Sequence, residues 1–267
     1  MTANPRPSTV VLVPGLSGSP DDYAFVHPML ARRGRVVTVD LSTEAAGVSF
    51  DAQVEHVRRT IDDLADQRRQ HDGGIGEQED DGGIGEQEDD GAHPIVLVGS
   101  SFGALVATAV AAADPRVTGL VLLGGWLAPD DRLGDALDHL VAVRERTSDL
   151  LDAVARLLLL SPSASSGATP PLLPADELTG RRLAWARSVD LRHVHVAAPV
   201  LVVTGRADAL VSPALSQELV GTFDDVRHAE LDAGHALLAE RPAEVLSLVE
   251  AFVDGRLAQG PVEAARI

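Results

Sequence analysis

Short apolar runs rich in β-branched residues alternate along the chain with stretches whose apolar residues recur at helical spacing. This alternation is typical of parallel βαβ units. Several runs are almost continuously hydrophobic, as expected for strands that helices cover on both faces. The sequence therefore predicts an α/β fold built on a parallel sheet. The predicted strands span residues 9–14, 35–40, 94–99, 118–124, 199–205 and 226–231.

Helical patterns fill most of the remaining chain. The predicted helices span residues 21–33, 50–70, 102–113, 213–222 and 242–257. Residues 126–190 contain no strand-like run, and their Leu, Ala and Arg content predicts several helices, interrupted by the Ser/Pro/Gly-rich residues 161–174. We expect residues 126–190 to form a helical cap over the strand ends. Residues 1–125 and 191–267 then form the core.

One acidic segment does not fit this pattern. The nonapeptide at residues 73–81 is repeated unchanged at 82–90. Its spacing resembles a calcium-binding nonapeptide, but Gln78 and Gln87 stand where the ligand aspartates belong, and two copies cannot build a stacked solenoid. We therefore expect residues 72–92 to form a disordered surface loop, remote from the edge of the sheet where sites form.

Composition narrows the function. The 267 residues, 45% of them apolar, suffice for one large α/β domain. With 22 basic and 40 acidic residues the net charge is −18, which disfavours nucleic acid and anionic membrane surfaces as partners. The chain has no cysteine and no lysine, which excludes thiolate metal sites, a cysteine nucleophile and Schiff-base chemistry. No run is long enough to span a membrane, and the N-terminus does not read as a signal peptide. We expect a cytoplasmic protein without metal or cofactor that acts on a small molecule; its oligomeric state stays open.

The most specific motif is the run Gly-Ser-Ser-Phe-Gly at residues 99–103, a G-x-S-x-G sequence. A hydrophobic strand precedes it and a helix rich in small residues follows, which is the setting of a nucleophile elbow. Glycine at both ends relieves crowding in such a tight turn. The helix N-terminus favours negative charge developing near Ser101. Ser101 is therefore the candidate nucleophile.

A serine hydroxyl is a weak nucleophile and needs a base. His235, in the run Asp-Ala-Gly-His-Ala just after the last predicted strand, lies at a strand end on the same edge as Ser101. His193 and His195 could share a metal, but no third ligand is near, and a surface pair is the simpler interpretation. The other histidines lack a strand-end position: His27, His56, His71, His93, His139 and His228.

The base in turn needs an orienting acid. Asp208 directly follows the strand at 199–205, again at a strand end. Asp130 and Asp131 are alternative acids, although the neighbouring Pro129 suits the entry to a lid instead. Alone, Asp208 would read as a turn residue. The order Ser…Asp…His on one edge favours a catalytic role, since it matches a known triad order.

A tetrahedral intermediate also needs donors for its oxyanion. Phe102, the residue after the candidate nucleophile, offers one backbone N–H, and Leu16 in the glycine-containing loop after the first strand offers the second. The alternative for this loop is a plain Gly-rich turn. The Leu16 and Phe102 side chains, with Trp126, could line an apolar pocket for substrate.

With these motifs in view, the chain resembles the α/β-hydrolase superfamily over nearly its whole length. The motifs that carry the resemblance are residues 13–16, 99–103, 205–208 and 234–235. The resemblance implies a central parallel sheet, a helical cap between Gly124 and Pro199, and cofactor-free serine chemistry. Three departures stand out. Pro14 occupies the position where many members carry a histidine, and the duplicated acidic segment is not part of the usual pattern. We also expect a reduced sheet, without the antiparallel strands that often begin the fold before the position of Thr9.

The sequence therefore predicts a serine hydrolase that cleaves a small or medium carboxylic ester, thioester or lactone through an acyl-enzyme. Other reactions on the same triad remain open, such as perhydrolysis, C–C bond hydrolysis or acyl transfer, because a fold does not determine a reaction. A ligand-binding protein without turnover is a further alternative, which the presence of Ser101, Asp208 and His235 disfavours.

Overall fold

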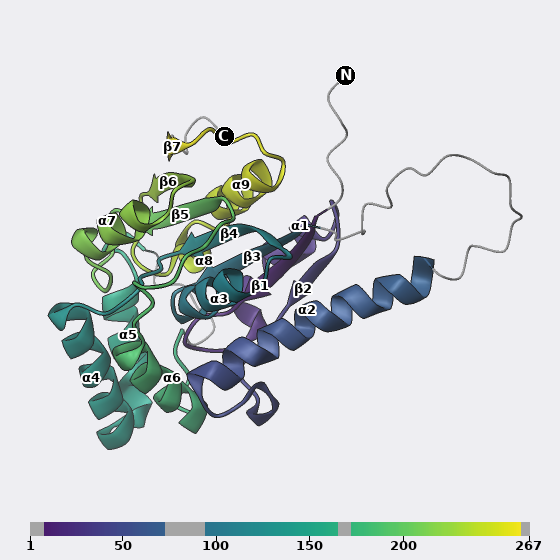
Figure 1. Cartoon of the computed structure of the whole chain (residues 1–267). Coiled ribbons are helices and arrows are strands. Elements are labelled where there is room, and N and C mark those ends of the chain that lie inside the picture. Colours follow the sequence, from purple (N-terminus) through teal and green to yellow (C-terminus); the bar gives the residue numbers. More distant parts are fainter. Residues whose placement is uncertain (1–7, 73–93, 165–171, 263–267) are drawn as a thin grey trace, which may run out of the picture.

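Strands from the whole length of the chain form one sheet in the computed structural model, which describes residues 8–72, 94–164 and 172–262 (Figure 1). All strand pairs are parallel, and the strand order is β2-β1-β3-β4-β5-β6-β7. The strands are β1 (Thr9–Val13), β2 (Val36–Thr38), β3 (Ile95–Ser100), β4 (Val117–Leu123), β5 (Val200–Gly205), β6 (Val226–Leu231) and β7 (Gly260–Val262). The predicted parallel α/β sheet is confirmed.

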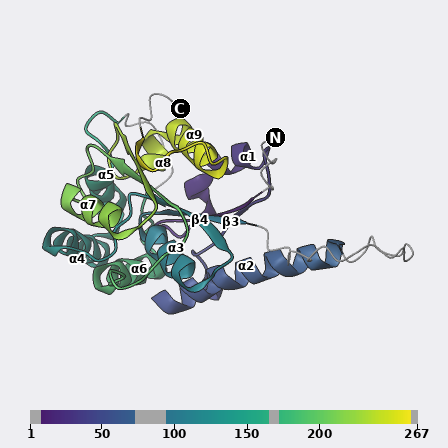
Figure 2. The same ribbon diagram turned by 45° about the horizontal axis from the view of Figure 1, so that its top comes forward.

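Helices cover both faces of the sheet, and the strands supply apolar side chains to each. In β1, Val11 and Val13 pack into one core and Val10 and Leu12 into the other, because successive side chains point to opposite faces. Helices α2 (Phe50–Asp72), α3 (Phe102–Ala113) and α7 (Pro213–Thr222) pack on the first face. Helices α1 (Val26–Leu30), α8 (Leu237–Glu240) and α9 (Pro242–Val253) pack on the second. Figure 2 shows α1 and α9 on one side of the sheet and α2 and α3 on the other.

The helix predicted over residues 21–33 is wrong. The chain instead forms a 3₁₀ turn, η1 (Pro20–Tyr23), and then the short α1. Pro28 has no N–H to continue a helix from η1. The fully buried Tyr23 hydroxyl donates to the carbonyls of Val13 (3.1 Å) and Val98 (2.9 Å), which holds this turn against the ends of β1 and β3.

Two strands at the sheet edges also differ from the predicted pattern. β2 spans three residues rather than the six predicted. β7 was not predicted, because three residues that include Pro261 are too few to show a period; it pairs with residues 227–229 of β6. Two further 3₁₀ turns are η2 (Glu44–Ala46) and η3 (Ser148–Leu150).

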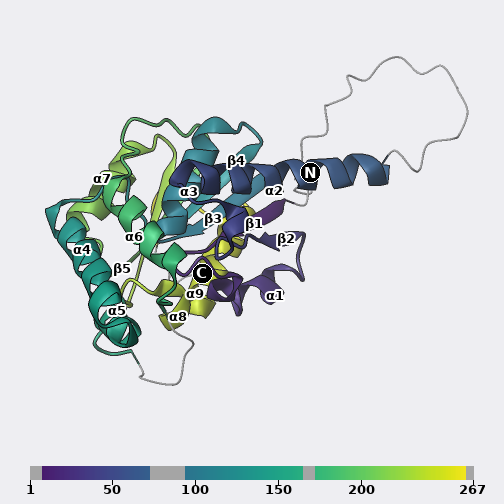
Figure 3. The same cartoon turned by 90° about the horizontal axis from the view of Figure 1, so that it is seen from below.

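Three helices separate β4 from β5: α4 (Asp131–Arg146), α5 (Leu151–Leu159) and α6 (Glu177–Ser188). Figure 3 shows them grouped beside α3. The ring of Trp185 in α6 lies 6.4 Å from that of Phe102, and the Ala236 N–H donates to the Leu159 carbonyl (2.8 Å). The α4–α6 insertion therefore lies against the loops that follow β3 and β6. Its predicted boundaries, 126–190, and its role as a cap stay predictions.

The strand order reverses at β1, which lies between β2 and β3. In open parallel sheets, ligand sites form at such a reversal, beyond the carboxyl ends of the strands. The loops after β1 and β3 are the two that contain Leu16 and Ser101. The duplicated acidic segment at 73–90 lies outside the described residues. Within the described ranges, no helix is long and apolar enough to cross a membrane.

Candidate active site

Ser101 occupies the turn between β3 and α3. It is the single non-glycine residue with positive φ (53°, with ψ −118°) in the part of the chain that the structure describes. Its N–H donates to the Leu123 carbonyl at the end of β4 (2.8 Å), and its carbonyl accepts from the Ala104 N–H in the first turn of α3 (2.9 Å). Neighbouring structure therefore imposes the strained backbone of Ser101, and such strain is typical of functional residues.

Gly99 and Gly103, on either side of Ser101, leave no room for a side chain. A Cβ on Gly99 would lie 2.4 Å from the Gly103 carbonyl oxygen. A Cβ on Gly103 would lie 2.3 Å from the carbonyl oxygens of both Val13 and Pro14. The crowding predicted at this turn is confirmed, and the second contact shows that the chain after β1 lies directly against the start of α3.

The structure brings together the three residues predicted from their strand-end positions. The Ser101 Oγ lies 2.8 Å from His235 Nε2, and His235 Nδ1 lies 2.9 Å from Asp208 Oδ2. The side chains of His235 and Asp208 are nearly buried, at 3% and 6% exposure, whereas Ser101 is partly exposed. The order of contacts is nucleophile, base and acid.

The environment of Asp208 keeps it ionised. Burial alone would raise its pKa, but His235 and the N–H groups of Val211 (2.8 Å) and Leu210 (2.9 Å) hold the pKa below its ordinary value. A carboxylate accepts hydrogen bonds only, so Nδ1 of His235 must carry a proton. In the neutral ring, Nε2 is then the acceptor that faces the Ser101 hydroxyl, which is the state needed to remove its proton.

The alternative acids lie elsewhere. Asp130 caps α4 by accepting from the Leu133 N–H (2.8 Å) and also accepts from the Ser212 hydroxyl (2.9 Å). Asp131 is the first residue of α4. His193 and His195 belong to no cluster of three or more metal-ligating side chains among the described residues.

The β1 loop (residues 14–18) lies beside Ser101. A Cβ on Gly15 would lie 3.5 Å from the Ser101 Cβ and 3.3 Å from the Ser100 carbonyl oxygen. The N–H groups of Leu16 and Phe102 donate no hydrogen bond to any described residue, although Leu16 and Phe102 are both buried. Two such amides beside a nucleophile can serve an incoming oxyanion. Their role as that pair of donors stays a prediction.

Two charged residues that the sequence analysis missed hold the β1 loop. Asp22 accepts from the Gly15 N–H (2.9 Å) and the Ser17 hydroxyl (2.7 Å). Arg182 in α6 is fully buried and donates to the carbonyls of Leu16 (2.7 Å) and Ser17 (2.8 Å). A signal for Arg182 exists in the sequence, because it falls on the same helical face as the buried Thr179, Leu183 and Ala186.

A third missed residue, Glu240 in α8, holds the β6 loop (residues 232–236), which contains His235. Its carboxylate accepts from the Gly234 N–H (2.9 Å) and the Ser161 N–H (3.0 Å), and also from the Ser161 hydroxyl. Glu240 therefore joins the loop of the candidate base to the chain that follows α5. A glutamate in a short helix gives no local sign of this role.

Trp126 contacts the candidate base. It is fully buried, and its ring centroid lies 6.4 Å from that of His235. Its Nε1 has no hydrogen-bond partner among the described residues. The predicted apolar substrate pocket formed by Leu16, Phe102 and Trp126 stays a prediction.

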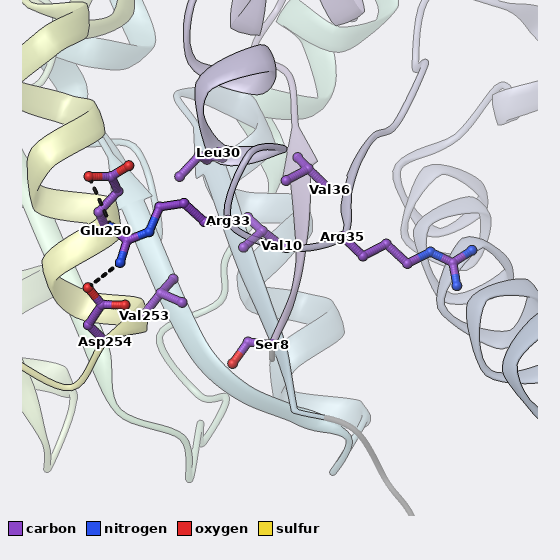
Figure 4. Close-up of a pocket in the computed structure, with 10 residues that line it drawn as sticks. Ser8, Val10, Leu30, Arg33, Arg35, Val36, Glu250, Val253 and Asp254 are labelled. Carbon is purple, nitrogen blue, oxygen red and sulfur yellow. Dashed lines mark hydrogen bonds and ion pairs between the residues drawn. The ribbon is translucent and has the colours of Figure 1, made fainter. Parts of the chain in front are cut away.

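None of these residues lines the surface hollow drawn in Figure 4. Ser8 and Val36, at the starts of β1 and β2, line it together with residues of α9. The starts of parallel strands form the edge opposite to Ser101. The Arg33 guanidinium at this hollow is paired with Glu250 (3.2 Å) and Asp254 (2.7 Å). We assign no chemistry to it.

Known proteins resemble this chain in sequence and in fold. The model of the alpha/beta hydrolase family matches residues 10–248. The chain belongs to the alpha/beta hydrolase family. The resemblance inferred from the motifs is thereby confirmed. Among curated proteins, this alpha/beta hydrolase is similar to lipase LipV of Mycobacterium tuberculosis, with 30% identity over 186 residues; the match covers 61% of this chain and 70% of the lipase.

Solved structures share the fold of this alpha/beta hydrolase at low identity. An esterase from Exiguobacterium antarcticum superposes with a TM-score of 0.70 at 14% identity, covering 94% of this chain and 93% of the esterase. A putative non-heme bromoperoxidase from M. tuberculosis gives 0.68 at 19% identity, covering 96% and 95%. An enol-lactonase from Burkholderia xenovorans gives 0.60 at 18% identity, covering 93% and 92%. These similarities establish the fold and leave the reaction open.

Proposed function

We propose that this alpha/beta hydrolase is a serine hydrolase that cleaves a small or medium carboxylic ester, thioester or lactone. The proposal rests on one observation, the continuous hydrogen-bond chain from Ser101 Oγ through His235 to Asp208. The same three residue types in this geometry activate a hydroxyl for attack on a carbonyl. The strained turn and the N-terminus of α3 at Ser101 support the assignment.

In the proposed mechanism, His235 Nε2 takes the proton of Ser101 while Oγ attacks the carbonyl carbon. The Leu16 and Phe102 N–H groups bind the resulting oxyanion, and Asp208 stabilises the charged imidazole. The intermediate collapses, the bond to the leaving group breaks, and His235 protonates that group. His235 then takes a proton from water as the water oxygen attacks the acyl carbon. The bond between that carbon and Ser101 Oγ breaks, the acid is released, and His235 returns the proton to Oγ.

We further propose that the α4–α6 insertion caps this site. The contacts of Trp185 with Phe102 and of Leu159 with Ala236 place two of its helices against the loops of the candidate nucleophile and base. A cap in this position would set the size of the acyl group that the enzyme accepts, and it would exclude water during the reaction.

The test is hydrolysis of p-nitrophenyl esters from acetate to decanoate by the wild type, Ser101→Ala and Ser100→Ala. Ser100 is the matched control, because it is the adjacent serine and forms no side-chain hydrogen bond with the described residues. We expect Ser101→Ala to lower kcat on the order of 10⁴-fold or more, and Ser100→Ala to retain most activity. A fluorophosphonate should label the wild type and Ser100→Ala only. Turnover that survives in Ser101→Ala, or a folded wild type without turnover, would refute the proposal.

A further inference from the structure

A carboxylate and a guanidinium hold the β1 loop: one accepts from its hydrogen-bond donors, and the other donates to its carbonyls. The Asp22 carboxylate binds a backbone N–H and a hydroxyl of the loop. The Arg182 guanidinium binds two of its carbonyls, and Nη1 also donates to the Leu41 carbonyl at 2.7 Å. Each ion thus takes the groups that its charge favours. Asp22 is close in sequence, but Arg182 comes from α6, 166 positions after Leu16.

These contacts determine the direction of the Leu16 N–H. The peptide group is planar, so the Gly15 carbonyl and the Leu16 N–H turn together. The Gly15 carbonyl accepts from the Gly18 N–H (3.0 Å), and the Gly15 N–H donates to Asp22. The next carbonyl, that of Leu16, accepts from Arg182 Nε. The peptide that carries the Leu16 N–H is therefore held on both sides, and rotating it would break one of these bonds.

The Arg182 guanidinium makes one further hydrogen bond among the described residues and no ion pair. Its remaining bond is to the hydroxyl of Thr179 on its own helix (3.2 Å), and within the described residues no carboxylate oxygen lies within 4 Å of it. It is fully buried and cannot meet a substrate in this arrangement. Burying a cation is costly unless its donors are all used, and here backbone carbonyls use most of them.

We propose that Arg182 is a positioning residue, which aligns the Leu16 N–H for the oxyanion and couples the α4–α6 insertion to that alignment. This rests on the proposed function, because it presupposes an oxyanion at Leu16. Arg182 acts through the loop and touches no reacting atom. An aligned donor stabilises the transition state more than the substrate, so its loss lowers kcat with little change in KM.

The test compares Arg182→Lys and Arg182→Met with the same changes at Arg181. Arg181 is the adjacent residue of α6 and pairs with the exposed Glu177 on the surface. Lysine keeps the charge but lacks the planar fork that reaches several carbonyls. We measure kcat for a p-nitrophenyl ester and express it per active site titrated by fluorophosphonate. We expect kcat to fall about tenfold in Arg182→Lys and about 100-fold in Arg182→Met, while KM changes by no more than about twofold. Both Arg181 variants should match the wild type.

A second measurement separates alignment from loss of folding. Phenylboronic acid forms a tetrahedral adduct on the serine that mimics the oxyanion, so its affinity should fall by the same factor as kcat. If Arg182→Met does not fold, Arg182→Lys decides. An unchanged kcat in Arg182→Lys, or a change in KM alone, would overturn the proposal.

Failure of the proposed function can be distinguished from failure of the role proposed for Arg182. If the wild type hydrolyses no ester, amide hydrogen exchange of a peptide covering residues 15–18 still reports on the β1 loop. Faster exchange in Arg182→Lys than in Arg181→Lys would show that Arg182 holds the loop. Equal exchange would refute that part as well.

Discussion

The β1 loop and the β6 loop both leave the carboxyl edge of the sheet and both contact the α4–α6 insertion, but they are held differently. The β6 loop is anchored by Glu240, six residues after Gly234, and by backbone bonds to its neighbours, including Ala207 N–H to the Ala233 carbonyl (2.9 Å). The β1 loop depends on the buried Arg182 from a distant helix. The candidate oxyanion donor thus depends on a buried charged side chain of the insertion. The loop of the candidate base instead has its charged anchor nearby in sequence, and it meets the insertion through the Leu159 carbonyl and through Ser161.

The largest effect on the free energy of unfolding should come from Gly18→Ala, which crowds Arg182 out of the β1 loop. A Cβ there would lie 2.8 Å from the Arg182 Cζ and 2.9 Å from the Leu41 carbonyl carbon, and Gly18 has a φ of +70°. Strain and overpacking together should lower the free energy of unfolding by about 2–4 kcal/mol and kcat by about tenfold or more. Urea unfolding and ester kinetics measure both.

Gly221→Ala is the control for that change, because a Cβ at this position in α7 meets nothing within 4 Å. We expect its free energy of unfolding to rise by up to about 1 kcal/mol, as helix propensity predicts. If Gly18→Ala is as stable and active as Gly221→Ala, the β1 loop does not need the contact with Arg182.

A smaller effect is expected for the β6 loop from Glu240→Gln. The amide oxygen can still accept from the N–H groups of Gly234 and Ser161, which share one carboxylate oxygen. The amide nitrogen, however, replaces the oxygen that accepts from the Ser161 hydroxyl, and the bonds lose the strength that the negative charge gives them. We expect a loss of about 1–3 kcal/mol in the free energy of unfolding and a decrease of several-fold to tenfold in kcat. Glu244→Gln is the control, since Glu244 is exposed and its nearest cation, Arg241, is 4.0 Å away.

Combining Glu240→Gln with Arg182→Lys tests whether the two loops are independent. The two side chains share no partner, so the effects on kcat should add to within about 0.5 kcal/mol. A coupling energy well above that value would mean that the insertion holds both loops as one unit, and that the two loops are not anchored independently.

The smallest effect concerns the pH dependence of stability. The pKa values of Asp208, beside the β6 loop, and Asp22, beside the β1 loop, are shifted in opposite directions. The pKa of Asp208 is lowered, so its ionised form stabilises the fold above the ordinary value of 3.8, and this stability is lost as pH falls through the folded-state pKa. Burial raises the pKa of Asp22, so the fold loses stability as pH rises from 3.8 through its folded-state value. Stability should therefore depend more steeply on acid pH in Asp22→Asn and less steeply in Asp208→Asn.

Urea unfolding at intervals between about pH 3 and pH 6 checks these slopes. Asp21→Asn serves as the control, because Asp21 is the exposed neighbour of Asp22. Equal slopes in Asp22→Asn and Asp21→Asn would contradict the expected contribution of Asp22.

The sheet and the three aligned side chains could be predicted because their signals are local. Continuous apolar runs mark buried strands, and a parallel sheet brings the carboxyl ends of those strands to one edge. Ser101 directly follows such a run, and Asp208 and His235 come within a few residues of one, so their positions near strand ends were enough to group them. The two glycines around Ser101 could likewise be explained from the turn alone.

The loop anchors could not be predicted in this way, because they depend on packing between distant segments. Arg181 and Arg182 are the same residue type side by side, and only the orientation of α6 decides that one is on the surface and the other is buried. From the sequence, Asp22 is an ordinary acidic residue in the first turn of a helix. In the structure it lies in η1, and its carboxylate accepts from the Gly15 N–H. Short elements such as β7, η1 and α1 were missed because periodicity needs more residues than they contain.

The two tryptophans of the chain, Trp126 and Trp185, have a consequence for optical work on the protein. One indole lies 6.4 Å from the imidazole of His235, and the other lies 6.4 Å from the ring of Phe102. All indole emission of the protein therefore originates beside His235 or beside Phe102, the residue that follows Ser101. Intrinsic fluorescence is thus a label-free signal that should respond when a ligand changes the surroundings of His235.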